Sequence, residues 1–467
     1  MNTNYFQELN ENPMFADVSV YNRTVMTAEQ MPAVVDEAIR QAYAKRGVAV
    51  ITILKDLGWQ EIEDNYISSA NLYQKPLPLE PDSERIQQAW KILKEAKHPL
   101  IYIGQGTRGA REEVLALSKM LQAPILSSAL AKGIVPDNAP AYMGSAGRVA
   151  SKPGVEIASN TDAVLFLGSD MPFQSFFIPE DAKYIQVDID GTKFGRRHQV
   201  DLAILADAKL TIKKLMEIGE QLPETAWYRA ALADKENWVE WLEKRSLIDS
   251  SPLEVEPVFK AINEMATDDA IFQVDVGNVT IDGMRLLDTS KNQRFTTSGW
   301  YATMGYALPA AIGAKSQYPN RQVWSISGDG AWAMVMPDIL TQVKYHLPII
   351  NVVLTNKSLG FIEAEQDDAK QPHSGIDLIG ANFGASAAAL GAVGFDVNNL
   401  SELKEAFAKA KETDRPVVIN VNIFDHRPLP VEQLKLDSSI YGEETVEAFE
   451  KEYQTQGLIP FSKLIKE

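Results

Sequence analysis

One stretch, Arg321-Gln-Val-Trp-Ser-Ile-Ser-Gly-Asp-Gly330, indicates the fold class of this chain. Its apolar first half is typical of a buried strand, and that strand ends in Gly-Asp-Gly. A second apolar run, 348–355, predicts another strand, which ends at Asn356. The 25 residues between Gly330 and Asn356 are enough for one crossover between parallel strands. We therefore expect Asp329 and Asn356 at the carboxyl ends of neighbouring parallel strands, where open α/β sheets bind ligands.

The residue types at these two strand ends suit a metal-bound diphosphate. A carboxylate, an amide oxygen and a nearby backbone carbonyl are hard ligands of the kind that Mg²⁺ or Ca²⁺ takes. Gly328 and Gly330 let a ligand approach the backbone, and a helix predicted over Trp332–Tyr345 would offer its N-terminus to phosphate oxygens. An isolated Gly-Asp-Gly is more often an ordinary turn. The strand before it, the helix after it and the Asn at the next strand end favour a functional site.

Outward from this stretch, strand-like and helix-like runs alternate, which predicts an α/β protein with parallel sheets. Five segments are predicted, in chain order 1–75, 80–215, 216–252, 253–428 and 429–467. The first holds only one helix and one strand, and the second is α/β. The third is a helical connector, the fourth is again α/β, and the last is a polar, helical tail. A Pro-rich stretch, 76–81, predicts an extended linker after the first segment.

Local signals place the elements of the first two segments. Thr27 and Gln30 resemble a capping box that opens a helix over Ala28–Lys45, which Gly47 closes before a strand over Val48–Leu54. The second segment is expected to be Rossmann-like. Its predicted elements are the helices Ser83–Ala96 and Arg111–Leu121 and the strands Leu100–Ile103, Pro124–Ser127, Ala163–Leu167 and Tyr184–Val187.

Composition excludes several classes of protein. The 467 residues include 45 Lys and Arg against 63 Asp and Glu, a net charge of −18, which opposes nucleic-acid binding. The absence of Cys excludes disulfides, iron–sulfur clusters and thiolate metal sites. The start, Met1-Asn-Thr-Asn-Tyr-Phe6, is no signal peptide, and the apolar runs are shorter than the roughly 20 residues of a spanning helix. We expect a cytoplasmic protein without membrane partners.

Over essentially its whole length, the chain resembles the pyruvate oxidase family of thiamine-diphosphate enzymes. The resemblance implies a pyrimidine-binding domain in 1–75, a central FAD-binding domain in 80–215 and a diphosphate- and Mg²⁺-binding domain in 253–428. The residues that carry it are Val274-Asp-Val-Gly-Asn278, Tyr301-Ala-Thr-Met-Gly305, Gly328-Asp-Gly330, Thr355-Asn-Lys-Ser-Leu-Gly-Phe-Ile362, Asp425-His-Arg-Pro-Leu-Pro430, Phe6-Gln-Glu-Leu-Asn-Glu-Asn-Pro13 and Val20-Tyr-Asn-Arg23.

The resemblance also implies roles for single residues around the thiamine. Asp329, Asn356 and the backbone carbonyl of Ser358 would bind the metal ion. Met304 would be the apolar wedge that holds the cofactor bent, although a gap-filling core Met is the commoner role of this residue type. The remaining residues implied to line the thiamine pocket are Gly277, Asn278, Gly305, Gly328 and Gly330.

A separate group would face the substrate. The resemblance places Phe361 and Ile362 on the substrate side and Glu365 near the reacting centre. The alternative for Glu365 is a solvated charge in the acidic run 363–368.

The flavin signal is spread over four pieces. Ile101-Tyr-Ile-Gly-Gln-Gly106 predicts a strand that ends in Gly104 and Gly106, and a tight turn explains it equally well. The resemblance adds 144–148, 165–168 and 187–190, in which Arg148 would pair with the flavin or its diphosphate and Asp188 or Asp190 would contact ribose or adenine. For Arg196-Arg-His198 we favour an exposed basic cluster.

An expected catalytic element is missing from the sequence. In the resembled family a Glu of the pyrimidine-binding domain activates the cofactor, and it lies upstream of the segment that matches Phe6–Pro13. Glu8 and Glu11 are no substitutes, because they follow a polar loop pattern. Three explanations stay open: another chain supplies the element, this chain is a truncated or reassigned member, or an internal Met was taken as the start.

The resemblance implies the reaction pyruvate + phosphate + O₂ → acetyl phosphate + CO₂ + H₂O₂, with thiamine diphosphate, Mg²⁺ and FAD as cofactors. One alternative is a carboligase of the acetolactate-synthase type, in which FAD is structural. Another is a catalytically silent cofactor-binding subunit. A homodimer or homotetramer is expected, or an assembly with a second chain that completes the pyrimidine domain.

Overall fold

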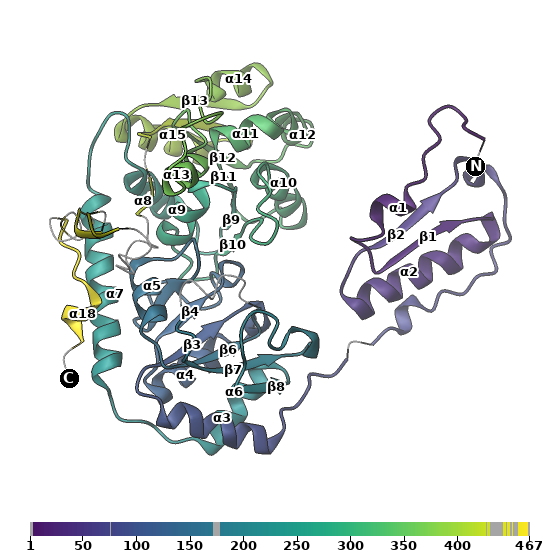
Figure 1. Cartoon of the computed structure of the whole chain (residues 1–467). Helices are drawn as coiled ribbons and strands as arrows, with labels where there is room; N and C mark the ends of the chain where they lie inside the picture. Colours follow the sequence, from purple (N-terminus) through teal and green to yellow (C-terminus); the bar gives the residue numbers. More distant parts are fainter. Residues whose placement is uncertain are drawn as a thin grey trace. The chain divides into compact units, whose positions relative to one another are not determined.

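Every strand pair in the described part of the chain is parallel, which confirms the α/β fold class. The computed structural model describes residues 3–74, 76–170, 178–425, 427–429, 442–444, 446–448, 451 and 456–465. The chain divides into two units, Met1–Pro78 and Leu79–Glu467. The first unit holds a two-stranded sheet, and the second holds two six-stranded sheets (Figure 1).

The first unit is built on one parallel strand pair. β1 (Tyr21–Val25) pairs with β2 (Ala49–Ile53), and α2 (Met31–Lys45) connects the two strands. The sequence did not predict β1, whose residues Tyr-Asn-Arg-Thr-Val lack a strong apolar run. The short elements of this unit are α1 (Asn12–Phe15), η1 (Ala28–Gln30), η2 (Lys55–Trp59) and η3 (Ala70–Leu72).

The first helix ends at Lys45 as predicted, but its start and the residues predicted to cap it need correction. A 3₁₀ turn precedes α2, so Thr27 makes no side-chain cap, and Gln30 Oε1 instead accepts a hydrogen bond from Met26 N at 3.3 Å. At the other end the left-handed residue is Arg46, with φ 51°, rather than Gly47. A side chain is excluded at Gly47 for a different reason, because a Cβ there would lie 2.4 Å from Val20 Cγ1.

The first six-stranded sheet has the order β5-β4-β3-β6-β7-β8. Successive side chains of its central strand β3 alternate between two cores, because Ile101 and Ile103 face α3, α4 and α6 while Leu100 and Tyr102 face α5 and α7. The bounds are α3 (Ser83–Glu95), β3 (Pro99–Ile103), η4 (Gln105–Thr107), α4 (Arg111–Leu121), β4 (Ile125–Ser127), η5 (Ala129–Ala131), β5 (Tyr142–Ser145), α5 (Lys152–Ser159), β6 (Ala163–Leu167), β7 (Lys183–Asp188), η7 (Gly191–Lys193), β8 (Leu202–Leu205), α6 (Ala208–Ile218) and α7 (Ala226–Arg245).

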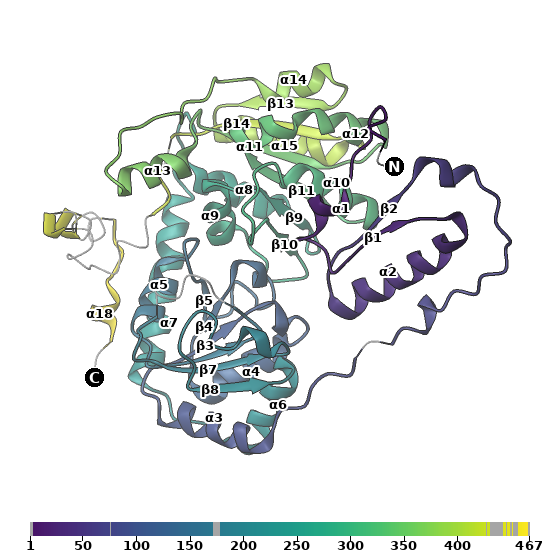
Figure 2. The ribbon, with the colours of Figure 1, turned by 45° about the vertical axis from the view of Figure 1, so that its right-hand side comes forward.

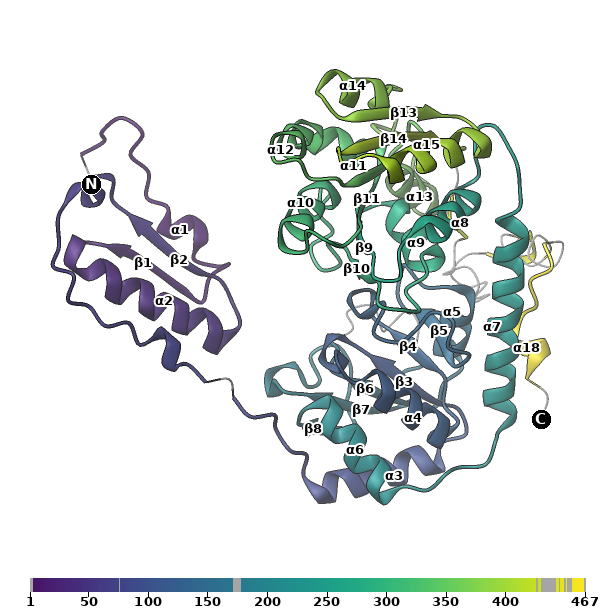
Figure 3. The same cartoon turned by 180° about the vertical axis from the view of Figure 1, so that it is seen from behind.

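A buried ion cluster joins α5 to α7. Lys152 Nζ contacts Asp234 Oδ1 and lies 2.6 Å from Glu156 Oε2. Glu156 also accepts a hydrogen bond from Phe461 N at 3.2 Å, and α18 (Phe461–Leu464) lies against α7 (Figures 1 and 3). Most of the tail predicted over 429–467 lies outside the described residues.

The second six-stranded sheet, in the green part of Figure 2, has the order β10-β9-β11-β12-β14-β13. Helices cover both of its faces: α8, α9 and α15 on one, and α10, α11, α12 and α14 on the other. The bounds are α8 (Val255–Met265), β9 (Ile271–Val274), α9 (Asn278–Leu286), β10 (Arg294–Thr296), α10 (Ala307–Gln317), β11 (Val323–Gly328), α11 (Asp329–Val335), η8 (Met336–Asp338), α12 (Ile339–Lys344), β12 (Ile350–Thr355), α13 (Gly360–Asp368), α14 (Phe383–Ala389), β13 (Val393–Val397), α15 (Leu400–Glu412) and β14 (Val417–Asn422).

The single helix predicted over Trp332–Tyr345 is wrong in its length. The structure has α11, a 3₁₀ turn and α12 in its place. Pro337 is the second residue of that turn and has no N–H to continue the hydrogen bonds of α11. The first of these helices, α11, also begins earlier than predicted, at Asp329 itself.

Within the described residues, no helix combines the length and the apolar character that crossing a membrane requires.

Candidate active site

The strand β11 presents Asp329 at its carboxyl end, as predicted. Its side chain is 5% exposed, with Oδ1 accepting a hydrogen bond from Gly330 N at 2.8 Å and Oδ2 accepting one from Lys357 N at 2.8 Å. Burial raises the pKa of the Asp329 carboxyl above its ordinary value, and the two N–H bonds oppose that rise. Each oxygen keeps a lone pair that can bind a cation.

The neighbouring strand β12 brings Asn356 to the same edge, because β11 and β12 pair in parallel. Asn356 Oδ1 accepts a hydrogen bond from Ser358 N at 3.3 Å, and its Nδ2 donates to Asp425 Oδ1 at 2.9 Å. Lys357, between them, has φ 66°, so the loop turns sharply back toward Asp329. Asp425 begins the motif Asp425-His-Arg-Pro-Leu-Pro430, of which His426 and Pro430 lie outside the described residues.

Two further turns approach these strand ends. Gly277, with φ 128°, starts α9 at Asn278, and Gly305, with φ 82°, follows Met304. A Cβ at Gly305 would lie 2.9 Å from Val335 Cγ1, so this turn has no room for a side chain. A Cβ at Gly330 would lie 3.4 Å from Met304 Cε, which places the Met304 side chain over the Gly-Asp-Gly turn.

The helix α13 carries the three predicted substrate-side residues. Phe361, Ile362 and Glu365 line one cavity, and none of the residues of α13 is buried. Glu365 Oε1 pairs with Arg148 Nη1 at 2.6 Å, and both side chains are about half exposed. Two residues predicted for different ligands thus contact one another, and the pair joins α13 to the loop after β5.

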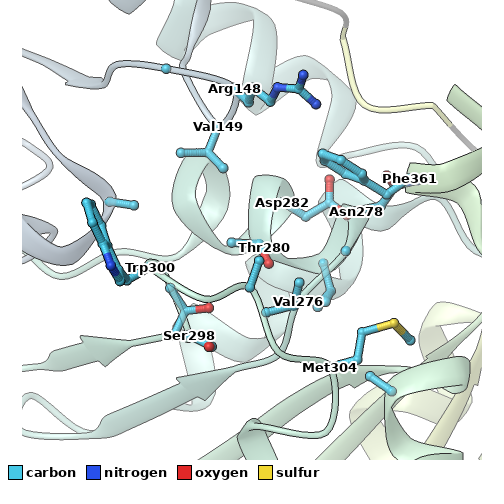
Figure 4. A pocket seen from close by; sticks show the side chains of 18 of the residues that line it. Arg148, Val149, Val276, Asn278, Thr280, Asp282, Ser298, Trp300, Met304 and Phe361 are labelled. Carbon is cyan, nitrogen blue, oxygen red and sulfur yellow. The ribbon is translucent and has the colours of Figure 1, made fainter. Parts of the chain in front are cut away.

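The cavity, of about 720 Å³, lies between the carboxyl ends of the two six-stranded sheets. Figure 4 shows Arg148 and Val149 at its top, Phe361 beside Asn278, and Met304 at its lower right. Predicted residues that line it are Arg148, Gly277, Asn278, Met304, Gly328, Asp329, Gly330, Asn356, Ser358, Phe361, Ile362 and Glu365.

Five predicted residues do not line the cavity: Gly104, Gly106, Gly305, Asp188 and Asp190. Gly104 and Gly106 allow the turns after β3 and β6 to cross, since a Cβ at Gly104 would lie 2.1 Å from the Gly168 carbonyl oxygen. Asp188 accepts a hydrogen bond from Asp190 N at 2.9 Å, and Asp190 caps a 3₁₀ turn by accepting one from Thr192 N at 3.0 Å.

The basic cluster at 196–198 is only partly the exposed cluster expected. Arg196 is exposed but also lines the cavity, with Nη1 3.3 Å from Asp170 Oδ2. His198 packs its ring against Phe166 and Tyr184, at centroid distances of 5.2 and 4.6 Å, and burial lowers the pKa of His198. Sequence alone missed these placements because they depend on the position of β6 and β7.

Several lining residues carried no sequence signal of their own. Trp300, 61% exposed, lies on the opposite side of the cavity from Phe361 in Figure 4. The polar ones among them are Ser128, Ser169, Asp170, Lys193, Thr280, Asp282, Thr297 and Ser298. Asp275 was inside a quoted motif, but only the fold reveals that its buried carboxylate accepts hydrogen bonds from Gly305 N and Ala307 N.

The donor set at the strand ends fits a magnesium ion that shares a diphosphate. One carboxylate and one amide oxygen lie together, with the backbone of Ser358 beside them. Among the residues the structure describes, no three His, Asp or Glu side chains are grouped to hold a metal alone. Mg²⁺ is commonly held by one or two carboxylates plus ligand phosphates, so the limited protein donor set suits it.

Two family models match the second unit. Residues 275–421 match the C-terminal TPP-binding domain of thiamine pyrophosphate enzymes, and residues 86–215 match their central domain. Thiamine pyrophosphate, or TPP, is another name for thiamine diphosphate. The first match contains Asp329 and Asn356, and the second contains Arg148.

Three curated relatives span most of the chain. A pyruvate oxidase of Lactiplantibacillus plantarum is 43% identical over 473 residues, which cover 100% of this chain and 78% of the relative. A putative thiamine pyrophosphate-containing protein of Bacillus subtilis is 37% identical, covering 91% of this chain and 74% of the relative. An acetolactate synthase large subunit of Corynebacterium glutamicum is 28% identical, covering 90% of this chain and 70% of the relative.

Proposed function

The chain belongs to the thiamine-diphosphate-dependent pyruvate oxidase family, and from this premise we propose that it oxidises pyruvate. The proposed reaction is pyruvate + phosphate + O₂ → acetyl phosphate + CO₂ + H₂O₂. The observation that supports it is that one cavity is lined by residues after the strands of both sheets, among them Asp329, Asn356 and Arg148. One continuous space would let a thiamine site and a flavin site exchange electrons.

For the thiamine side, we propose that Asp329, Asn356 and the Ser358 carbonyl hold Mg²⁺ on the diphosphate. Gly277, Asn278, Gly305, Gly328 and Gly330 would shape the pocket around it. The support for Gly305 and Gly330 is the close packing at their turns, since a Cβ would lie 2.9 Å from Val335 Cγ1 at Gly305 and 2.9 Å from Leu359 Cδ2 at Gly330. Met304 would support the bent cofactor from below.

For the flavin side, we propose FAD, with Gly104 and Gly106 shaping the strand ends and Asp188 or Asp190 serving the ribose or adenine. Lys193 and Arg196 line the cavity, and their positive charge suits the FAD diphosphate. Arg148 would contact the flavin or its diphosphate while still close to Glu365. When bound, thiamine diphosphate supplies the nucleophilic carbon and electron sink for decarboxylation, and FAD supplies the electron acceptor.

The remaining residues prepare the substrate side. Phe361 and Ile362 present apolar side chains to the cavity and would keep water from the reacting carbon. Glu365 would lie near that carbon, and the Arg148 guanidinium offsets its charge, so that the pyruvate carboxylate meets less repulsion. We also propose that 80–215 and 253–428 are the two cofactor domains, with 216–252 connecting them, and that the protein is a cytoplasmic homodimer or homotetramer.

A second candidate is an acetolactate-forming carboligase. It is favoured by the relative named an acetolactate synthase large subunit, whose identity is lower, at 28%. In that case FAD would bind without being reduced by pyruvate.

An anaerobic spectrum separates these functions. The chain is reconstituted with FAD, thiamine diphosphate and Mg²⁺ and mixed with pyruvate while the absorbance of oxidised flavin is followed. Loss of that absorbance, with H₂O₂ after air is admitted, supports the oxidase. Flavin that stays oxidised contradicts it, and an assay for acetolactate then tests the carboligase.

The metal-binding role proposed for the Gly328-Asp-Gly330 motif is tested by the variant Asp329→Ala. This variant is expected to lose Mg²⁺-dependent binding of thiamine diphosphate, measured by calorimetry, because the carboxylate proposed to bind the metal is removed. Asp338→Ala, on the following 3₁₀ turn and outside the cavity lining, is the matched control. Equal affinity in Asp329→Ala and the parent would show that the metal assignment is wrong.

A further inference from the structure

A buried carboxylate beneath the cavity connects the elements that carry its predicted thiamine residues. Asp275 follows β9, is 0% exposed and does not line the cavity. We propose that Asp275 is a positioning residue, which fixes the Met304–Gly305 turn relative to the strand end that presents Asp329. This inference rests on the proposed function, because it assigns Asp275 to the thiamine part of that site.

The long-range hydrogen bonds of Asp275 come from two separate elements, α10 with the turn before it and β11. Its Oδ1 accepts from Gly305 N at 2.9 Å and Tyr306 N at 3.3 Å, and its Oδ2 accepts from Ala307 N at 3.1 Å. Oδ2 also accepts from Ser327 Oγ at 3.1 Å, at the end of β11. One side chain directly after β9 therefore holds both the start of α10 and Ser327, the residue next to Gly-Asp-Gly.

The turn that Asp275 holds has little freedom to move. Gly305 has φ 82°, and a Cβ there would lie 2.9 Å from Val335 Cγ1, so the backbone already lies against α11. Met304 directly precedes this glycine, and its Cε reaches within 3.4 Å of the Cβ position of Gly330. A shift of the Gly305 amide would therefore move the Met304 side chain across the cavity floor.

The chemistry of the site requires a carboxylate at this position. Val276 N also donates to Oδ1, at 2.9 Å, so both oxygens of Asp275 act only as acceptors. An Asn would direct its NH₂ group at backbone N–H groups, which are donors themselves. It would leave buried donors without acceptors and would displace the turn.

An ordinary helix cap would explain the same hydrogen bonds, but it makes a different prediction. A cap contributes to stability alone, whereas a positioning residue acts on the part of the ligand that Met304 contacts. Two probes separate these parts. Inorganic diphosphate with Mg²⁺ tests the metal-binding strand ends, and thiamine diphosphate with Mg²⁺ tests those ends together with the turn.

The experiment measures both affinities by calorimetry in the full-length parent, Asp275→Asn, Met304→Ala and the double variant. Asp275→Asn is expected to lose about tenfold or more in thiamine diphosphate affinity, because hydrogen bonds to a charged group are lost. Its affinity for inorganic diphosphate should fall by less than about threefold. The loss in the double variant should fall well short of the product of the single losses, because both changes act through Met304.

Asp162→Asn is the matched control. Its carboxylate also accepts hydrogen bonds from two backbone groups, Lys97 N at 2.9 Å and His98 N at 2.8 Å, but lies outside the cavity lining. It should keep both affinities. Equal losses for the two probes in Asp275→Asn, or independent losses in the double variant, would overturn the positioning role. A parent that binds neither probe would contradict the proposed function instead.

Discussion

At the scale of single residues, Gly305 is expected to tolerate no methyl group. Its φ of 82° disfavours any L side chain, and Val335 Cγ1 occupies the space for a Cβ at 2.9 Å. Gly305→Ala should therefore lower the free energy of unfolding by about 1–3 kcal/mol and weaken thiamine diphosphate binding. Denaturant titration and calorimetry measure the two effects.

Gly109→Ala separates backbone strain from the steric contact at Gly305. Gly109 has φ 86°, but nothing lies within 4 Å of its Cβ position. Gly109→Ala should lower the free energy of unfolding and leave the affinity for thiamine diphosphate unchanged. If both variants weakened binding equally, the contact with Val335 would not matter.

The buried Asp234 predicts a pH dependence of stability. Burial, followed by the nearby Glu156 charge, raises the pKa of Asp234 to about 8. Because an unfolded Asp titrates near pH 4, the folded chain holds an extra proton between about pH 4 and about pH 8. This contribution to stability is complete at the acidic limit and is lost as the pH rises to about 8.

Asp234→Asn cannot titrate, so it should reduce the fall in Tm between about pH 5 and about pH 8. Thermal melts of the parent and the variant across this range measure the effect. The same change at the exposed Asp249 is the control and should leave the parent profile intact. A parallel pair of profiles for Asp234→Asn and parent would refute the assignment.

Sequence predicted residues that a local pattern or a family motif marks, and it missed a role that appears only in the folded contacts. Asp329 and Asn356 were found because each directly follows an apolar strand, and the parallel pairing of β11 with β12 confirms where they lie. Asp275 was not singled out, because its acceptor role depends on Gly305 and Ala307, about 30 residues further along the chain. No local pattern marks such a partner.

At the scale of elements, α13 is held over the cavity mainly by polar contacts. None of its residues is buried, while Arg148 pairs with Glu365 and Arg427 pairs with Asp368. An exposed ion pair contributes about 0.2–1 kcal/mol. Arg148→Ala should therefore speed hydrogen exchange in 360–368 by up to about fivefold, a difference that high salt should remove.

Mass spectrometry of exchanged peptides measures this opening. Arg229→Ala is the matched control. It removes an exposed ion pair between Arg229 on α7 and Glu224 just before that helix, and it should leave hydrogen exchange in 360–368 unchanged. Exchange in α13 that does not respond to Arg148→Ala would mean that other contacts hold the helix.

Element boundaries were predictable where caps and periodicity agree. The helix Arg111–Leu121 and the strand Ala163–Leu167 have the predicted bounds. The helix predicted over Trp332–Tyr345 does not have its predicted bounds, because Pro337 interrupts an otherwise helical pattern. The four-residue strands β5 and β8 were missed, since four residues are too few to establish a strand periodicity.

At the scale of the whole chain, every residue that lines the cavity belongs to the unit Leu79–Glu467. That unit also holds all five buried clusters of the described residues. A variant that comprises 79–467 should therefore keep Mg²⁺-dependent affinity for inorganic diphosphate within about threefold of the full chain. Calorimetry measures the affinity, and circular dichroism verifies the helical content. A complete loss of affinity in a folded variant would assign part of the site to 1–78.

Trp300 has a photophysical consequence. Five of the eight indoles are buried, whereas Trp300 is 61% exposed on the cavity wall and Trp59, in the first unit, is 84% exposed. In a Trp59→Phe chain, the red-shifted component of the emission would come mainly from Trp300. A bound flavin would accept that excitation energy, so the chain carries its own optical reporter of whether its cavity is filled.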